Sequence, residues 1–158
     1  MLQVGSKFPN FSLKNQDGTT KSLADYAGRW LVLYVYPKDD TPGCTIQGKS
    51  FTARKDDFDD NETTVVGVSQ DDVDSHKSFC NKYSFTFDLL ADPEAKLLKA
   101  AEVEQVDYKG SMYWERTTFI IDPSGVLKKL HTKVTPEGHE RVLLNEIQDL
   151  KKTANTPA

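Results

Sequence analysis

Residues 30–36 form an apolar run, Trp-Leu-Val-Leu-Tyr-Val-Tyr, that no charged residue interrupts. A strand with one face in water alternates apolar and polar side chains, so this run indicates a strand buried on both faces. A sheet is buried on both faces when other elements, usually helices, pack on each side of it. The run therefore restricts the chain to an α/β architecture, and Pro37 directly behind it marks the end of the strand.

The segments around this strand predict alternating strands and helices. Asp17-Gly18, between short alternating segments at 11–13 and 19–23, is typical of a hairpin. Thr41-Pro42 starts a helix, because Thr is favoured as N-cap and Pro at the first helical position. The other predicted elements are a helix over 42–58, strands over 63–69 and 87–90, a helix from Asp71 or Asp72 to Tyr83, a short helix from Pro93, an irregular loop over 105–114, a hairpin over 117–121 and 126–130, and an amphipathic helix over 136–150.

This order of elements predicts one α/β domain over residues 1–151, with a central mixed sheet flanked by helices. Residues 152–158 are expected to form a disordered tail. The chain of 158 residues is long enough to bury a substantial core. No internal repeat or linker divides it.

Charge and cysteine content narrow the function classes. The net charge is -4 and the charges are interspersed, which does not favour nucleic acid or an anionic membrane surface as a partner. No segment has the apolar length of a membrane span, and residues 1–10 have no apolar signal core. The two cysteines are too few for a secreted disulfide scaffold. We therefore expect a cytoplasmic protein whose cysteines are either core residues or reactive groups.

Of the two cysteines, Cys44 lies at the position that better favours a reactive thiolate. If Thr41 is the N-cap, Cys44 lies in the first turn of a helix that begins at the end of a buried strand. Free backbone N–H groups and the positive end of the helix dipole favour a thiolate there, and the thiolate is the nucleophilic form. A small core residue is the alternative, but the Thr, Pro and Gly neighbours make a core position unfavourable.

Residues 43–50 also match the phosphate-binding pattern G-x-x-x-x-G-K-[ST] at every specified position. Three features argue against nucleotide binding. Residues 37–42 separate the pattern from the strand, Asp39 and Asp40 would repel a polyphosphate, and the Thr41-Pro42 start places the pattern inside a helix. Helical N–H groups cannot form a phosphate nest.

The residues Pro37, Thr41 and Cys44 form P-x-x-x-T-x-x-C, which resembles the active-site signature of peroxiredoxins. The longer string over 36–45, Tyr-Pro-Lys-Asp-Asp-Thr-Pro-Gly-Cys-Thr, is similar to the Q-type group, also called bacterioferritin comigratory proteins. Arg116, just before the predicted strand at 117–121, matches the second-site arginine of that family. Further matching positions near the N-terminus are Gly5, Phe8, Pro9, Phe11, Leu13, Asp17 and Gly18.

The resemblance implies a thioredoxin-like fold and a peroxidase that reduces hydrogen peroxide or alkyl hydroperoxides without a cofactor or metal. Cys44 would attack the peroxide and become a sulfenic acid. Thr41 would hydrogen-bond the thiolate and the peroxide, and Arg116 would stabilise the charge of the O–O displacement. The peroxide would contact Pro37, Thr41, Gly43 and Arg116, with Pro37 and Pro42 shielding it from water. A thioredoxin- or glutaredoxin-type dithiol would restore the thiols, and the protein would act as a monomer.

Many Q-type proteins carry a resolving cysteine five residues after the first, where this chain has Lys49. The resemblance then leaves Cys80, in the next predicted helix, to form an intramolecular disulfide with Cys44, as in atypical two-cysteine members. Cys80 shares an apolar helix face with Val73 and Tyr83, so a core position is the alternative.

Two further alternatives concern histidines and function. His76 and Cys80 are four residues apart, but no other spacing supports a metal site. We expect His76, His131 and His139 to be solvated. A non-enzymatic peroxide sensor would use the same Cys44, and slow turnover with thioredoxin would distinguish it. A thioredoxin-like reductase would need a C-x-x-C pair, which the sequence lacks.

Overall fold

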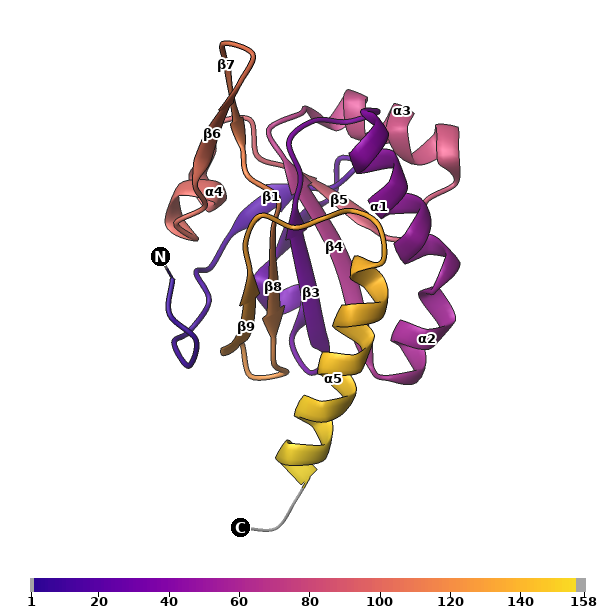
Figure 1. The fold of residues 1–158 in the computed structure, drawn as a ribbon, viewed down its shortest axis with the longest axis vertical. Coiled ribbons are helices and arrows are strands. Elements are labelled where there is room, and N and C mark those ends of the chain that lie inside the picture. Colours follow the sequence, from indigo (N-terminus) through magenta and orange to yellow (C-terminus); the bar gives the residue numbers. More distant parts are fainter. Residues whose placement is uncertain (1, 156–158) are drawn as a thin grey trace.

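The computed structural model describes residues 2–155, which are built around a seven-stranded sheet (Figure 1). The strand order is β2-β1-β5-β4-β3-β8-β9, and the apolar run lies at β3 (Trp30–Val35), whose residues are all buried. β3 pairs in parallel with β4 (Thr63–Ser69) and antiparallel with β8 (Thr117–Ile121). The predicted α/β class with a central mixed sheet is confirmed.

Both predicted hairpins are present. β1 (Ser12–Lys14) pairs with β2 (Thr20–Ser22), and β8 pairs with β9 (Leu127–His131). At the first turn, the side-chain oxygen of Asn15 accepts backbone N–H groups of Asp17 and Thr19, each at 3.0 Å. A short helix, η1 (Leu23–Tyr26), follows, and β1 also pairs with β5 (Asp88–Ala91), which joins this hairpin to the main sheet.

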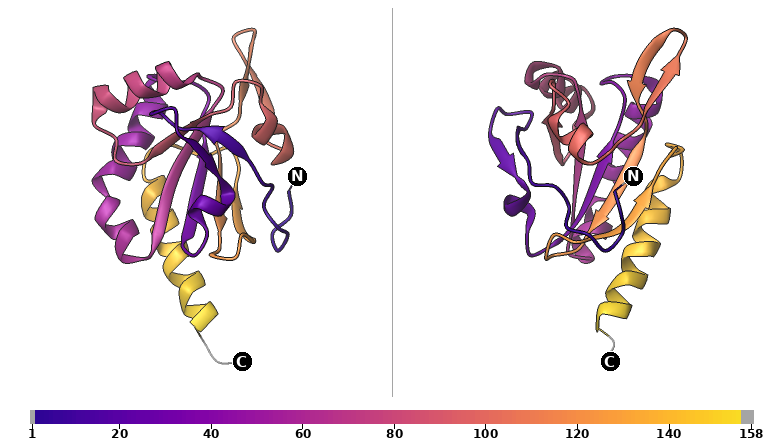
Figure 2. Two further views of the ribbon diagram at one scale, coloured as in Figure 1. Left: turned by 180° about the vertical axis from the view of Figure 1, so that it is seen from behind. Right: turned by 90° about the vertical axis from the view of Figure 1, so that its left-hand side faces the viewer.

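Four helices share one face of the sheet: α1 (Pro42–Ala53), α2 (Lys55–Asp60), α3 (Val73–Tyr83) and α5 (His139–Asn155). The strands β3, β4 and β5 are adjacent and parallel, so two right-handed crossovers place α1 and α3 on that same face. The other face is covered by the N-terminal segment, η1 and α4 (Lys96–Ala100). Figure 2 shows these two layers with the sheet between them.

Two predicted helices have different bounds in the structure. The helix expected over 42–58 ends at Ala53, and α2 begins after Arg54 in a new direction that still buries Phe58 against Phe51, with ring centroids 5.7 Å apart. The helix expected from Pro136 begins at His139, because Gly138 has a positive φ of 78° that no helix accommodates. It continues to Asn155, so the tail predicted from 152 is helical over 152–155; residues 156–158 lie outside the described part.

The loop predicted over 105–114 is wrong, since this segment forms a hairpin. β6 (Gln105–Tyr108) pairs with β7 (Ser111–Trp114), and Lys109 and Gly110 turn between them with φ of 52° and 85°. The hairpin extends away from the main sheet (Figure 1). Its end leads directly to Arg116 and β8. No helix within residues 2–155 has the length and apolar character that crossing a bilayer requires.

Candidate active site

The helix that carries Cys44 begins where the sequence predicts. Thr41 is the N-cap with extended backbone, Pro42 takes the first helical position, and Cys44 follows in the first turn. The backbone N–H of Thr45 donates to the Thr41 carbonyl at 2.9 Å, so the amides of Gly43 and Cys44 precede the first intrahelical bond. These amides leave partial positive charge at Cys44.

The Thr41 hydroxyl does not cap the helix through its side chain. It donates to the Lys38 carbonyl at 2.9 Å, which fixes the oxygen in the segment between β3 and α1. Its lone pairs remain able to accept a hydrogen bond from a peroxide O–H. In the same segment Pro37 is half-buried, whereas Pro42 is exposed.

Arg116 lies across the first turn of α1. Nη1 donates to the side-chain oxygen of Gln47 at 2.6 Å. A Cβ atom at Gly43 would lie 2.4 Å from Nη2, so any side chain there would displace the guanidinium from its present position. The absence of a side chain at Gly43 is what allows the guanidinium to approach the helix. The structure therefore places Arg116 beside Gly43 and Gln47, on the first two turns of the helix that carries Cys44.

Gln47 belongs to this site, and the sequence reasoning missed it. It lies three residues after Cys44, hence on the same helix face, and it is buried. Its Nε2 has no hydrogen-bond partner within residues 2–155, so its one bond to Arg116 determines its orientation. The signal available in the sequence was the spacing of a polar residue one turn after the nucleophile.

Cys44 is a buried thiol, 1 % exposed, in the core beneath the four helices. Tyr34 and Tyr36 of β3 line the same core. Burial raises the pKa of Tyr34 well above its usual value, and the nearby Cys44 and Cys80 sulfurs raise it further. Tyr34 therefore stays a neutral phenol beside both cysteines.

Cys80 lies on the buried face of α3 and is 7 % exposed. The predicted cap is confirmed, since the Asp72 side chain accepts the Ser75 N–H at 2.8 Å. Burial, followed by the charge of Asp39, raises the pKa of Cys80 to about 12. In this conformation Cys80 is a protonated thiol and a poor nucleophile.

Two histidines are not solvated as the sequence reasoning expected. His76 is fully buried on α3 and lies against Asp39. His139 is buried at the start of α5, with Nε2 2.9 Å from the Thr118 hydroxyl. His131 is partly exposed and contacts Glu146. The partners of His76 and His139 are distant in sequence, which is why spacing alone did not reveal them.

The residues of the phosphate-binding pattern at 43–50 serve helix formation and packing rather than phosphate binding. Residues 42–53 are helical, so the N–H groups from Thr45 onward are used within the helix. Gly48 is required because a Cβ there would lie 2.2 Å from the Phe85 ring. Lys49 places Nζ 5.0 Å from the centroid of the Tyr83 ring.

Comparison with known proteins agrees with this geometry. Residues 4–130 match the AhpC/TSA family. The chain is 40 % identical over 149 residues to a putative peroxiredoxin bcp of Helicobacter pylori, covering 92 % of this chain and 98 % of the relative. It is 37 % identical over 154 residues to peroxiredoxin Bcp of Bacillus subtilis, covering 96 % and 98 %.

Solved structures show the same relationship. A cysteine-to-serine mutant of Xylella fastidiosa PrxQ superimposes with a TM-score of 0.90 at 36 % identity, covering 96 % of this chain and 98 % of that one. The bacterioferritin comigratory protein of Xanthomonas campestris, studied for alkyl peroxide reduction, gives a TM-score of 0.83 at 35 % identity, covering 88 % and 90 %. With this fold, this helix N-terminus and these relatives, the chain belongs to the AhpC/TSA family and is a peroxiredoxin of the Bcp/Q group, a thiol peroxidase.

Proposed function

We propose that Cys44 reduces hydrogen peroxide and alkyl hydroperoxides and that Cys80 resolves the product. The observation that carries the proposal is the approach of Arg116 to the first turn of α1, where Gly43 leaves room for it. A cation and free helix amides at the turn that carries a buried sulfur form a site for negative charge. This is the charge that develops when a thiolate displaces oxygen from oxygen.

In the first step the Cys44 thiolate attacks the terminal oxygen of the peroxide. An S–O bond forms as the O–O bond breaks, and the leaving alkoxide or hydroxide takes up a proton to become alcohol or water. Arg116 and the helix amides stabilise the leaving oxygen, and the Thr41 oxygen accepts a hydrogen bond from the peroxide O–H and orients the substrate, the proton staying on the oxygen that becomes the sulfenic acid. Pro37 and Gly43 border the substrate.

In the second step the Cys80 sulfur attacks the Cys44 sulfenic acid. An S–S bond forms, the S–O bond breaks, and water leaves. Because both cysteines lie in one core yet in different helices, parts of α1 and α3 must open to bring the sulfurs together. A dithiol of the thioredoxin or glutaredoxin type then reduces the disulfide by exchange. A monomer in the reducing cytoplasm is the setting we propose.

Intact mass after one equivalent of peroxide tests both steps. The wild-type protein should lose two hydrogens, which identifies a disulfide within one chain. Cys44→Ser should leave the mass and the peroxide unchanged. Cys80→Ser should gain one oxygen as a stalled sulfenic acid. Peroxide consumption by Cys44→Ser at the wild-type rate would refute the proposed nucleophile, and a dimer mass in the wild type would refute the intramolecular pairing.

A further inference from the structure

Two consecutive aspartates between β3 and α1 hold α3 on both sides of Cys80. Asp39 lies beside His76 one helical turn before Cys80, with Oδ2 2.7 Å from Nδ1. Asp40 accepts hydrogen bonds from Lys82 Nζ at 2.7 Å and from the Tyr83 hydroxyl at 2.8 Å, just after Cys80. The segment that leads into the Cys44 helix thus contacts the Cys80 helix at two points.

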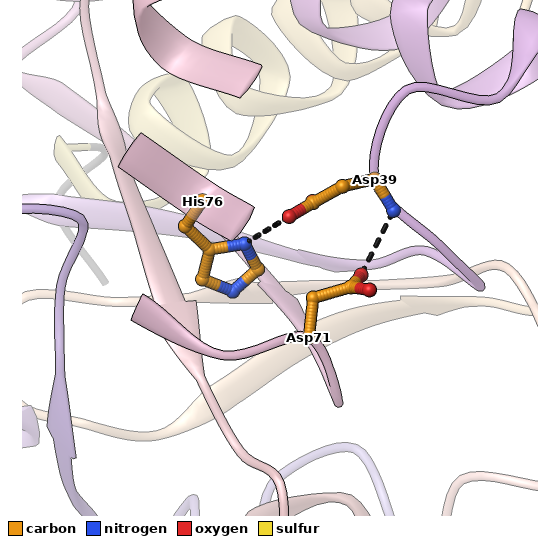
Figure 3. A group of neighbouring side chains, drawn as sticks. All are labelled: Asp39, Asp71 and His76. Atoms are coloured by element: carbon orange, nitrogen blue, oxygen red, sulfur yellow. Dashed lines mark hydrogen bonds and ion pairs between the residues drawn. The ribbon is translucent and has the colours of Figure 1, made fainter. Parts of the chain in front are cut away.

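The contact at Asp39 is buried and fully hydrogen-bonded (Figure 3). His76 Nε2 lies 2.9 Å from the Leu90 carbonyl, which can only accept, so Nε2 carries a hydrogen. The Asp39 carboxylate also accepts from the hydroxyls of Tyr36 at 2.6 Å and Ser75 at 2.8 Å. With Nδ1 2.7 Å from Asp39 and Nε2 bonded to Leu90, both ring nitrogens of His76 have a hydrogen-bond partner, so the ring is held from two sides.

Asp71 also holds Asp39 in place. Its Oδ2 accepts the backbone N–H of Asp39 at 2.8 Å (Figure 3). The same oxygen accepts the hydroxyl of Ser69 at 2.6 Å. These bonds join the segment before α1 to β4 as well as to α3. Breaking a buried pair of this kind leaves an uncompensated charge, which is strongly destabilising.

The contact at Asp40 is weaker. The side chains of Lys82 and Asp40 are 57 % and 44 % exposed, and water screens such pairs. Asp40 has a φ of 57° and directly precedes the N-cap Thr41. Ser84, with a φ of 54°, ends α3 just beyond Tyr83. Unwinding the first turn of α1 therefore displaces Asp40 directly, whereas Asp39 is anchored from two sides.

We propose that the contacts of Asp40 with Lys82 and Tyr83 break during the resolving step, whereas the contact of Asp39 with His76 persists. We call the first the latch and the second the pivot. When Cys44 is a sulfenic acid, residues 79–84 leave Asp40 while Ser75 and His76 stay on Asp39, and this motion brings Cys80 to Cys44. The proposal rests on the proposed role of Cys80. It assigns positioning roles to Asp39, Asp40 and His76, which do not contact the peroxide.

The chemistry of Cys80 supports the direction of this motion. Burial and the Asp39 charge keep the Cys80 thiol protonated where it is. Moving away from a stationary Asp39 into solvent removes both effects, so the sulfur becomes a better nucleophile only when the latch is open. Cys80 would then react with the sulfenic acid in the open state and remain inert in the closed one.

The latch is tested by weakening it without altering the backbone. Asn tolerates the left-handed conformation of Asp40, so Asp40→Asn combined with Tyr83→Phe removes the ion pair and the hydroxyl bond. Asp59→Asn on α2 is the matched control, since Asp59 pairs with Lys55 at 2.6 Å and is similarly exposed. After peroxide addition and rapid acid quench, intact mass follows the loss of two hydrogens with time.

The double variant should form the disulfide roughly three- to tenfold faster than wild type, as expected for loss of a weak exposed contact. The rate of sulfenic acid formation, measured with Cys80→Ser added, should be unchanged, and so should both rates in Asp59→Asn. An unchanged or slower disulfide step in the double variant overturns the latch. If the wild type forms no internal disulfide at all, it is the proposed role of Cys80 that fails.

The pivot is tested on the wild-type protein, so no variant needs to fold. In the disulfide form, amide hydrogen exchange over 80–84 should be at least roughly tenfold faster than in the reduced form, while exchange over 75–77 is unchanged. The ring N–H signals of His76 in a proton–nitrogen NMR spectrum should persist in both redox states. Loss of those signals on oxidation, or equal acceleration over 75–77, overturns the pivot.

Discussion

Nη1 of Arg116 lies 2.6 Å from the side-chain oxygen of Gln47, so the helix that carries Cys44 also holds the cation over its own first turn. Gln47→Met keeps the volume and removes the acceptor. A lost hydrogen bond to a charged group is worth about 1.5–3 kcal/mol, so we expect the rate of Cys44 oxidation to fall roughly tenfold or more. Stopped-flow competition for peroxide measures this rate. Gln47→Glu should restore it, and full activity in Gln47→Met would show that Arg116 needs no support.

Removing the guanidinium itself should have a larger effect. Fixed donors at a developing oxyanion are worth about 100- to 1000-fold, and we expect a loss of that size in Arg116→Ala. Arg116→Lys should fall between the two, because Lys keeps the charge but not the planar fork of donors. The second-order rate constant with hydrogen peroxide reports the difference. Equal rates for wild type and Arg116→Ala would remove Arg116 from the mechanism.

The two helix glycines should respond differently to the same substitution. In Gly43→Ala the new methyl meets the mobile end of Arg116, so the peroxidase rate should fall while stability changes little. In Gly48→Ala it meets the partly buried Phe85 ring, which packs against Phe79, and we expect a stability loss of about 1–3 kcal/mol with the rate of the folded protein retained. Urea unfolding together with the oxidation rate separates the cases. The reverse pattern would contradict the placement of Arg116.

His139 should make the protein less stable in mild acid. Burial first, and the charge of His131 second, lower the pKa of His139 to about 4 from an ordinary 6.5. The unfolded chain therefore binds the proton more tightly than the folded protein does. The contribution of His139 to the free energy of unfolding is fully present above pH 6.5 and is lost as pH drops toward 4, by up to about 3 kcal/mol.

The check is urea unfolding at pH 7 and pH 4.5 for wild type and His139→Gln. The variant should lose less stability between the two pH values than wild type does. His131→Gln is the comparison variant and should keep most of the pH dependence. An equal loss in wild type and His139→Gln would mean that other groups cause it.

The pattern at 43–50 should not bind nucleotide. Its backbone is helical and Lys49 lies over Tyr83, so neither the N–H groups nor the amine is arranged around a phosphate. Calorimetry with ATP and magnesium should give no binding heat. Micromolar binding that disappears in Lys49→Ala would require a different conformation of this segment.

The sequence predicted the parts of the fold that follow from local chemistry. The buried run at β3, the Thr41-Pro42 helix start and the Asp72 cap each depend on residues adjacent in the chain, and each is present. Cys44 could be proposed as the nucleophile because a helix N-terminus after a buried strand is such a local feature. Arg116 was found through a family resemblance and not through its own neighbours.

The features that the sequence analysis missed depend on partners distant in the chain or lie in an exposed segment with few tertiary contacts. The hairpin at 105–114 is exposed over most of its length, and its alternation of polar and apolar residues extends over only the four residues Gln105–Tyr108, too short a segment to distinguish a strand from a loop. His76 is buried only because Asp39, distant in sequence, provides a buried carboxylate. Gln47 acquires its role from Arg116 in the same way. Spacing along one chain does not contain these pairings.

The burial of both thiols also determines how the cysteines can be counted. Cys44 and Cys80 lie in the core beneath the helices, so a bulky labelling reagent reaches either sulfur only while its helix is open. Titrating the native reduced protein for a short time will therefore undercount its thiols. Followed to completion, and compared with labelling of the unfolded chain, the same titration measures the fraction of time that each helix is open.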